Sequence, residues 1–296
     1  MRIEIAVDAR NGVGEGPWWD DADGTLWWVD IPARLVLAWR PGDGSPRRYG
    51  LPDMASAVVG RKEGGFLLAV RDGIYTLDPT TGETGLYLRH ERDRPDNRTN
   101  EAKVDPLGRF WVGTMQNNLN PDGSGKEMTG SFGALYCLRP DRRITREVDN
   151  VGLSNTLAWS PDGRTMLFAD TMTNIIRRFD VDADGHVSNP RVFSDEKLPG
   201  HCDGSAIDAQ GYLWNARFAA GRLIRFAPDG KVDSQIELPV TNPTSCAFGG
   251  PDLKTLYVTS ARHGLTKEQL QANPHEGALL AVHTGVEGTP SYRFAG

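Results

Sequence analysis

The chain has 296 residues, of which 39% are hydrophobic and 24% charged, a composition typical of a folded protein with a large core. Its net charge is −6 and it has no basic block, so we expect neither nucleic acid nor a membrane as partner. It lacks the apolar run of a membrane helix or a signal peptide, and its three cysteines are far apart. We therefore expect a protein of the reducing cytoplasm, a monomer or weak dimer.

Short strands and tight turns dominate the pattern of the chain. It contains 34 Gly, 19 Pro and 8 Trp, and only Thr266–Ala272 is expected to be helical. A unit recurs that consists of an apolar strand, a turn with Asp or Gly, an aromatic-rich strand and a third strand. In chain order its copies begin at Glu15–Asp30, Ala57–Asp78, Ala102–Thr114, Val151–Thr171, Ser205–Ala216 and Ser245–Ser260.

The spacing of these copies predicts the fold. Their second strands start at steps of 40, 43, 57, 46 and 43 residues, which is typical of four-stranded propeller blades. The longest step contains an insertion, Gln116–Ser131. We therefore expect an all-β, six-bladed β-propeller with a central channel, as one domain over residues 1–296. The alternative is a large β-sandwich whose units resemble one another by accident.

Two further features of the ring can be predicted. The fourth strand of each blade should be the segment that leads into the next unit, such as Arg47–Leu51 and Val232–Leu238. An open ring would expose sheet edges, so we expect the terminal segments Ile3–Val7 and Ser291–Phe294 to pair and close it.

Polar residues stand just before several of the first strands. In a propeller these positions converge at one end of the channel, whatever their separation in sequence. Glu15, Asn155 and Asp203 hold such positions in blades one, four and five. Each alone is typical of a turn or cap, but together they offer two carboxylates and an amide oxygen, the hard donors that Ca²⁺, Mg²⁺ or Mn²⁺ prefer.

Blade three brings Arg98, Asn100 and Glu101 to the same end. Arg98 could anchor a hydroxylated or anionic substrate, or form a surface salt bridge in its charged segment. His201 is either a substrate contact or a loop residue. The segment Asp180–Gly185 begins like a calcium-binding EF-hand loop, but Arg191 stands where that loop needs a bidentate Glu, so we expect a hairpin turn.

Longer motifs carry a family resemblance over nearly the whole chain. They are GEGPWW with DI at 30–31, RTNEAKVDPLGRFWVGTM, GLSNTLAWSPDGRTMLFADT, DGSAIDAQGYLWNA, CAFGGPDLKTLYVTSAR and the terminal YRFAG. The sequence resembles the gluconolactonase/regucalcin family of six-bladed propellers, which includes senescence-marker proteins, sugar lactonases and luciferin-regenerating enzymes. Within that family it is most similar to bacterial aldonolactonases.

The resemblance implies a site and a reaction. One divalent ion (Ca²⁺, Zn²⁺, Mg²⁺, Mn²⁺ or Fe²⁺) would be held by Glu15, Asn155 and Asp203, and the substrate by Arg98 and Asn100 with Glu101 beside them. The family pattern is Asn-Asp where this chain has Asn100-Glu101, and many relatives have Pro in place of Cys202. In the insertion, Glu127 is the candidate for a lid or substrate residue.

The implied activity is metal-dependent hydrolysis of a small sugar lactone. The ion would polarise the lactone carbonyl, and Asp203 would be the base that takes the proton from the attacking water. Two alternatives remain open at this point. The protein could be a calcium-binding regulator, the role suggested for some animal relatives, or a propeller that serves only as a binding scaffold.

Overall fold

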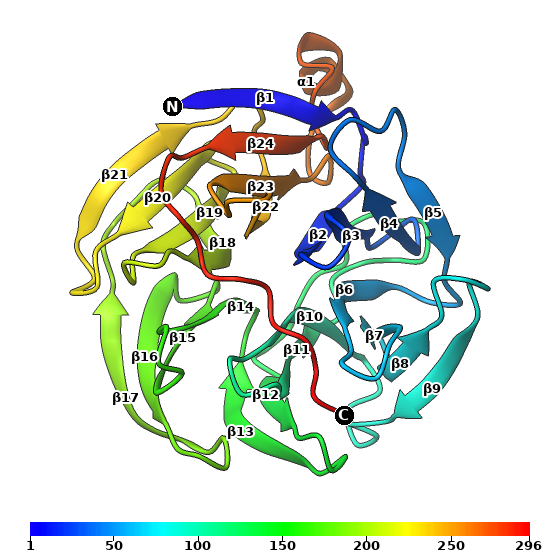
Figure 1. The fold of residues 1–296 in the computed structure, drawn as a ribbon, viewed down its shortest axis with the longest axis vertical. Helices are drawn as coiled ribbons and strands as arrows, with labels where there is room; N and C mark the ends of the chain where they lie inside the picture. Colours follow the sequence, from blue (N-terminus) through cyan, green and yellow to red (C-terminus); the bar gives the residue numbers. More distant parts are fainter.

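The computed structural model describes all residues from 1 to 296. Its 24 strands form six antiparallel sheets of four strands each, arranged as blades around a common centre (Figure 1). The first strand of each blade lies innermost, and these inner strands contact one another around the ring. The predicted six-bladed β-propeller is confirmed, and its strands follow the sequence units in order.

The blades are numbered from the N-terminus. Blade 1 contains β2 (Gly14–Asp20), β3 (Thr25–Asp30), β4 (Leu35–Trp39) and β5 (Arg47–Gly50), and blade 2 contains β6 (Ala55–Gly60), β7 (Phe66–Val70), β8 (Gly73–Leu77) and β9 (Thr84–Leu88). Blade 3 contains β10 (Asn97–Val104), β11 (Phe110–Gln116), β12 (Gly133–Leu138) and β13 (Ile144–Val151), and blade 4 contains β14 (Ser154–Trp159), β15 (Thr165–Asp170), β16 (Ile175–Val181) and β17 (Val187–Ser194). Blade 5 contains β18 (His201–Ile207), β19 (Leu213–Phe218), β20 (Arg222–Phe226) and β21 (Val232–Glu237). Blade 6 contains β22 (Pro243–Gly249), β23 (Thr255–Ser260), β24 (Leu279–His283) and β1 (Arg2–Val7).

The expected helix is present as α1 (Lys267–Ala272) between β23 and β24, with Thr266 as its N-cap. The segment Asp180–Gly185 contains the end of β16 and the expected hairpin turn to β17, in which the Gly185 amide donates to the Asp182 carbonyl. No helix in the structure has the length and apolar character needed to cross a membrane. The three cysteines are buried and unpaired.

The N-terminal strand closes the ring, as predicted, but not with the predicted partner. β1 pairs with β24, so that Ile3 lies opposite Val282 and Ile5 opposite Leu280. The expectation that Ser291–Phe294 would pair with Ile3–Val7 is therefore wrong. Leu279–His283 provides an apolar strand next to β23, while the segment that begins at Thr289 bonds to other blades.

A recurring aspartate explains the hairpins of blades 3 and 5. Asp105 and Asp208 each directly follow an inner strand, with Gly three residues later and Trp six residues later. Asp105 Oδ2 accepts from Trp111 Nε1 at 2.9 Å, and Asp208 Oδ2 accepts from Trp214 Nε1 at 3.0 Å. The other carboxylate oxygen accepts from two backbone amides of the turn in each case. One carboxylate thus fixes the turn and the tryptophan that packs between blades.

Aromatic side chains fill the spaces between neighbouring blades. Trp27 of blade 1 contacts Phe66 of blade 2 with ring centres 4.1 Å apart. Similar pairs join Trp111 to Trp159 at 5.8 Å, and Trp214 to Phe248 at 6.0 Å. Burial of these rings holds adjacent blades together, because large aromatic surfaces dominate the energetics of such contacts.

The C-terminal segment crosses the ring on the side where the inner strands end (Figure 1). The Thr289 amide donates to the Ile207 carbonyl of blade 5, and Trp18 Nε1 of blade 1 donates to the Tyr292 carbonyl. The Phe294 amide donates to the Gly60 carbonyl of blade 2, while its side chain is fully buried in the largest apolar cluster. The last residues therefore connect blades that are far apart in sequence.

Removing the Phe294 ring should loosen this connection. We expect Phe294→Ala to lower the free energy of unfolding by about 3–5 kcal/mol, because it leaves a cavity in the core. Chemical denaturation of the two proteins measures the difference. Phe132→Ala is the matched control, since Phe132 is 49% exposed, and it should change stability little. Equal stability of Phe294→Ala and the unchanged protein would contradict this role of the tail.

Candidate functional site

All six inner strands have an irregularity at the same level, close to where they begin. Each changes its pairing register with the second strand of its blade there, as a β-bulge does. A bulge turns the next side chains away from the regular alternation and often lies beside an active site. The shifts lie between Glu15 and Trp18, Ala55 and Ala57, Thr99 and Ala102, Asn155 and Ala158, Cys202 and Ser205, and Pro243 and Cys246.

Aspartates at the ends of the second strands fix the chain just before two of these bulges. In blade 1, Asp30 accepts hydrogen bonds from the amides of Gly12 and Val13 at 3.0 and 3.1 Å. In blade 4, Asp170 accepts from the amides of Gly152 and Leu153 at 2.8 and 3.0 Å. The separation from Glu15 to Asp30 equals that from Asn155 to Asp170. Blades 1 and 4, on opposite sides of the ring, therefore place their candidate ligands by the same local device (Figure 1).

A pocket of about 460 Å³ opens at the end of the ring where the inner strands begin. Its walls contain five of the six residues predicted for the site, namely Glu15, Arg98, Asn100, Asn155 and Asp203. Glu15 and Asp203 are 8% and 7% exposed, so their carboxylates are nearly removed from solvent. The structure thus gathers the residues that sequence reasoning proposed, although they come from four different blades.

The electrostatics of the two carboxyl groups are unusual. Burial raises the pKa of Glu15 to about 8, with Glu101 contributing in the same direction. Burial also raises the pKa of Asp203 well above its ordinary value, and the charges of Glu15 and Glu101 raise it further. Each acid opposes the ionisation of the other in this poorly hydrated place. A cation between them would reverse that effect.

The donor set fits a divalent cation. Glu15 Oε2 accepts from the Gly16 amide at 2.9 Å and Asp203 Oδ1 from the Gly204 amide at 3.1 Å, which leaves the second oxygen of each for an ion. Asn155 Nδ2 donates to Thr171 Oγ1 at 2.8 Å, and its Oδ1, which accepts from Asn100 Nδ2 at 3.3 Å, is the oxygen of this amide that would bind an ion. No three His, Cys, Asp or Glu side chains gather as a metal site anywhere in the protein, so this set depends on the amide.

Arg98 is buried beside the acids without a carboxylate partner. Its Nη1 donates to Asn100 Oδ1 at 2.7 Å and to the Thr99 carbonyl at 2.8 Å. Its Nε and Nη2 both donate to Asn118 Oδ1, at 3.3 and 2.9 Å. Burial lowers the pKa of Arg98 to about 10, which leaves it charged at neutral pH. The alternative of a surface salt bridge is therefore excluded, and a guanidinium held by neutral groups faces the pocket.

Glu101, unlike Arg98 and Asn100, does not face the pocket. It is not among the residues that line the pocket; both its carboxylate oxygens are buried, and Oε1 lies 3.5 Å from Lys103 Nζ. A contact of Glu101 with substrate stays a prediction, while the geometry supports an ion pair with Lys103.

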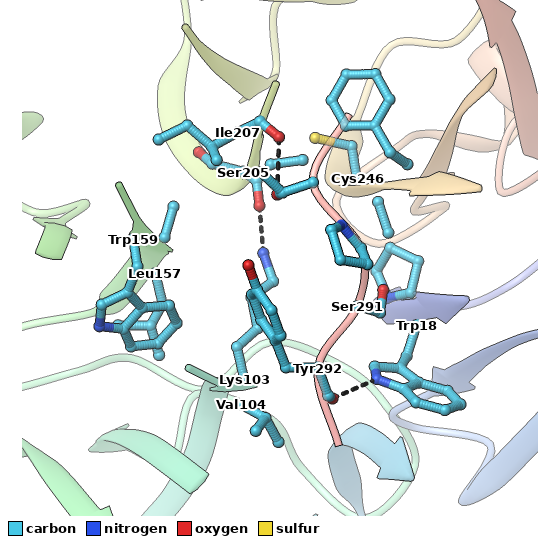
Figure 2. A pocket seen from close by; sticks show the side chains of 17 residues that line it. Trp18, Lys103, Val104, Leu157, Trp159, Ser205, Ile207, Cys246, Ser291 and Tyr292 are labelled. Carbon is cyan, nitrogen blue, oxygen red and sulfur yellow. Dashed lines mark hydrogen bonds between the residues drawn. The ribbon is translucent and has the colours of Figure 1, made fainter. Parts of the chain in front are cut away.

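Lys103 in turn lines a second cavity, of about 80 Å³, at the opposite end of the inner strands. Figure 2 shows its ammonium group reaching the Ser205 carbonyl, with Tyr292 beside Lys103 and Trp18 bonded to the Tyr292 carbonyl. Eleven of the 17 residues that line this cavity are hydrophobic. This cavity is small and its walls are mostly apolar, so the pocket of about 460 Å³ is the better candidate for a substrate site.

Sequence reasoning missed several residues of the pocket. Asn118 and Leu119 come from the insertion, and Thr244 and His263 from blade 6. Glu127, the candidate of the insertion, is exposed and does not line the pocket. The contact of Asn118 with Arg98 has no signal in a single sequence. Thr244 could have been found, because it is the second residue of an inner strand, as Asn155 is.

His201 lines the pocket as the first residue of β18 and is exposed, so it is a strand residue of the site and not a loop residue. Fold and pocket together define a β-propeller with a small-molecule site of two acids and an amide at the beginning of its inner strands.

Comparisons with known proteins identify the family. The family model described as SMP-30/Gluconolactonase/LRE-like region matches residues 13–262. The chain is 35% identical to a regucalcin of Xenopus laevis over 303 residues, covering 100% of this chain and 99% of that protein. It is also 35% identical to a 6-deoxy-6-sulfogluconolactonase of Pseudomonas putida over 297 residues, covering 99% of both.

Among solved structures, the chain is similar to one described as a calcium-binding protein, regucalcin, from Agrobacterium tumefaciens. The TM-score is 0.91 at 32% identity, covering 98% of this chain and 96% of that one. The chain therefore belongs to the SMP-30/gluconolactonase/LRE-like family.

Binding of a divalent ion should depend strongly on pH. With a pKa of about 8, Glu15 is protonated at pH 6, and an ion must displace that proton to bind. We expect the apparent dissociation constant for Ca²⁺ or Mn²⁺ to fall by at least about tenfold from pH 6 to pH 7 and to level off above pH 8. Calorimetric titration in two buffers of different ionisation enthalpy measures both affinity and proton release. A constant affinity without proton release would contradict the raised pKa.

Proposed function

We propose that the protein hydrolyses a sugar lactone to the corresponding aldonic acid, with one divalent ion held by Glu15, Asn155 and Asp203. The observation that carries the proposal is the pair of buried carboxyl groups beside an amide in the wall of a pocket, each with a raised pKa that a cation would relieve. Family membership and relatives named as lactonases support the same class of hydrolase. Candidate substrates are aldono-1,4- or 1,5-lactones such as glucono-, xylono-, arabinono- or galactonolactone.

The residues of the pocket have distinct roles in this proposal. When bound, the ion supplies Lewis acidity at the lactone carbonyl. Asp203 takes the proton from the attacking water as general base. Arg98 and Asn100 bind hydroxyl groups of the ring, and the hydrogen bonds of Arg98 to Asn100 and Asn118 hold the guanidinium in one orientation.

Substitution of the acids tests the proposal. We expect Asp203→Asn to lower kcat by about 10²–10⁴-fold, because it removes the base, and to weaken ion binding as well. Glu15→Gln should weaken ion binding and, at low concentrations of ion, activity. The assay is proton release from a panel of aldonolactones with Ca²⁺, Zn²⁺, Mg²⁺ or Mn²⁺, before and after treatment with EDTA.

Asp229→Asn is the matched control, because Asp229 is an exposed carboxylate in the turn between β20 and β21, and it should leave activity unchanged. Full activity of Asp203→Asn, or of the EDTA-treated protein, would refute the proposed mechanism.

A second candidate function is calcium binding without a dedicated lactonase role. The similar structure from Agrobacterium tumefaciens, described as a calcium-binding protein, favours it. Three protein donors make a weak and open calcium site, which suits catalysis better than buffering. Calorimetry separates the two, since submicromolar Ca²⁺ affinity with no hydrolysis of any lactone in the panel would support the second function.

A further inference from the structure

The residue that follows each candidate ligand lies close to the inner strand of the next blade. Gly16 follows Glu15, and a Cβ there would lie 2.8 Å from the Ser56 carbonyl oxygen of blade 2. Gly204 follows Asp203, and a Cβ there would lie 2.1 Å from Ser245 Oγ of blade 6. Any larger residue would therefore clash with the next blade at these two positions of blades 1 and 5. Blade 4 differs, because Thr156 follows Asn155.

Thr156 has a backbone conformation that suits glycine. Its φ is +51°, close to the +54° of Gly16 at the same position in blade 1. A β-branched residue with positive φ is a genuine outlier and costs on the order of 1–3 kcal/mol, so the surroundings must hold it there. Such outliers gather at functional sites, and the contacts of this one indicate which function it serves.

The Thr156 side chain joins two of the candidate ligands. Its Oγ1 donates to the carbonyl oxygen of Asp203 at 2.7 Å, across the boundary between blades 4 and 5. Asn215 Nδ2 donates to the same carbonyl at 2.9 Å and to Thr156 Oγ1 at 3.1 Å. Thr156 and Asn215 are both fully buried. Because Thr156 directly follows Asn155 in the chain, its hydroxyl fixes the backbone of Asp203 relative to that of Asn155.

We propose that Thr156 is a positioning residue for the divalent ion, which sets the distance between Asn155 and Asp203 through this hydrogen bond. The proposal rests on the proposed function only in so far as these residues bind an ion. A glycine at this position would remove the backbone strain together with the hydrogen bond to Asp203. Blades 4 and 5 would then be joined here through Cys202, which bonds to Thr171 and Asn174. Groups that orient metal ligands without touching the metal change affinity by about 10–100-fold when they are removed.

The test compares three substitutions by calorimetric titration with Ca²⁺, Mn²⁺ and Zn²⁺, following the ion that the unchanged protein binds most tightly. We expect Thr156→Gly to weaken affinity for that ion by about tenfold, with cooperative thermal unfolding retained. Thr156→Ala, which keeps Cβ but lacks the hydroxyl, should weaken it to a similar degree and serves if the glycine variant does not fold. Thr156→Ser keeps the hydroxyl and should bind within about threefold of the unchanged protein.

Asn189→Gly is the matched control for backbone conformation. Asn189 also has a positive φ, +51°, but is exposed on β17 at the outer edge of the same blade. This substitution should alter stability without altering ion affinity. If Thr156 had only a structural role, its substitution would have the same effect.

The outcomes separate this inference from the proposed function. If the unchanged protein binds none of the three ions, the role of Thr156 is refuted, and the activity assay with and without EDTA decides the proposed function. If it binds one, and Thr156→Gly and Thr156→Ala bind it equally well, only the role of Thr156 is refuted. Loss of affinity in Thr156→Ser as large as in Thr156→Gly would also refute it, because the hydroxyl would then not be the group responsible.

Discussion

Two carboxyl groups, those of Glu15 and Asp203, are buried near one another at the beginning of the inner strands, and the surrounding structure has to hold them there. Burial and mutual repulsion both oppose their ionisation. Their backbones are fixed by groups on other strands and blades: the Asp30 carboxylate just before Glu15, and Thr156 and Asn215 on the carbonyl of Asp203. The position of the acids is therefore imposed by the fold, and a divalent cation is the partner that would make it favourable.

The site draws on blades 1, 3, 4 and 5, so its geometry depends on the integrity of the whole ring. Two contacts of high sequence separation provide this. β1 pairs with β24 and thereby supplies the outer strand of blade 6. On the opposite side from the pocket, the C-terminal segment bonds to blades 5, 1 and 2 in turn and buries Phe294. The tail does not line the pocket, yet its hydrogen bonds help to hold blades 1 and 5, which carry Glu15 and Asp203, in place.

The sequence permits accurate prediction where the cause is local. The repeat, the turn aspartates and the residues before the inner strands are all set by short segments, which is why Glu15, Asn155 and Asp203 could be placed together. Prediction failed where the partner is distant in sequence. Nothing near Phe294 reveals that it binds beside Gly60, and nothing in the insertion reveals that Asn118 holds Arg98. Thr156 looks like an ordinary strand residue, because a β-branched side chain favours strands and its positive φ appears only in three dimensions.

The partners of Arg98 complete the electrostatic argument. A guanidinium in contact with Glu15 or Asp203 would neutralise a carboxylate that a cation needs, and a carboxylate is its strongest protein partner. The structure instead gives Arg98 only neutral acceptors, the amides of Asn100 and Asn118 and the Thr99 carbonyl. These bonds satisfy most of its donors, so Arg98 forms no ion pair with either acid and acts on them only through its charge. With a divalent ion on the two carboxylates, the positive charge of Arg98 would remain in the pocket, where it favours the negative charge that develops on a lactone as water attacks it.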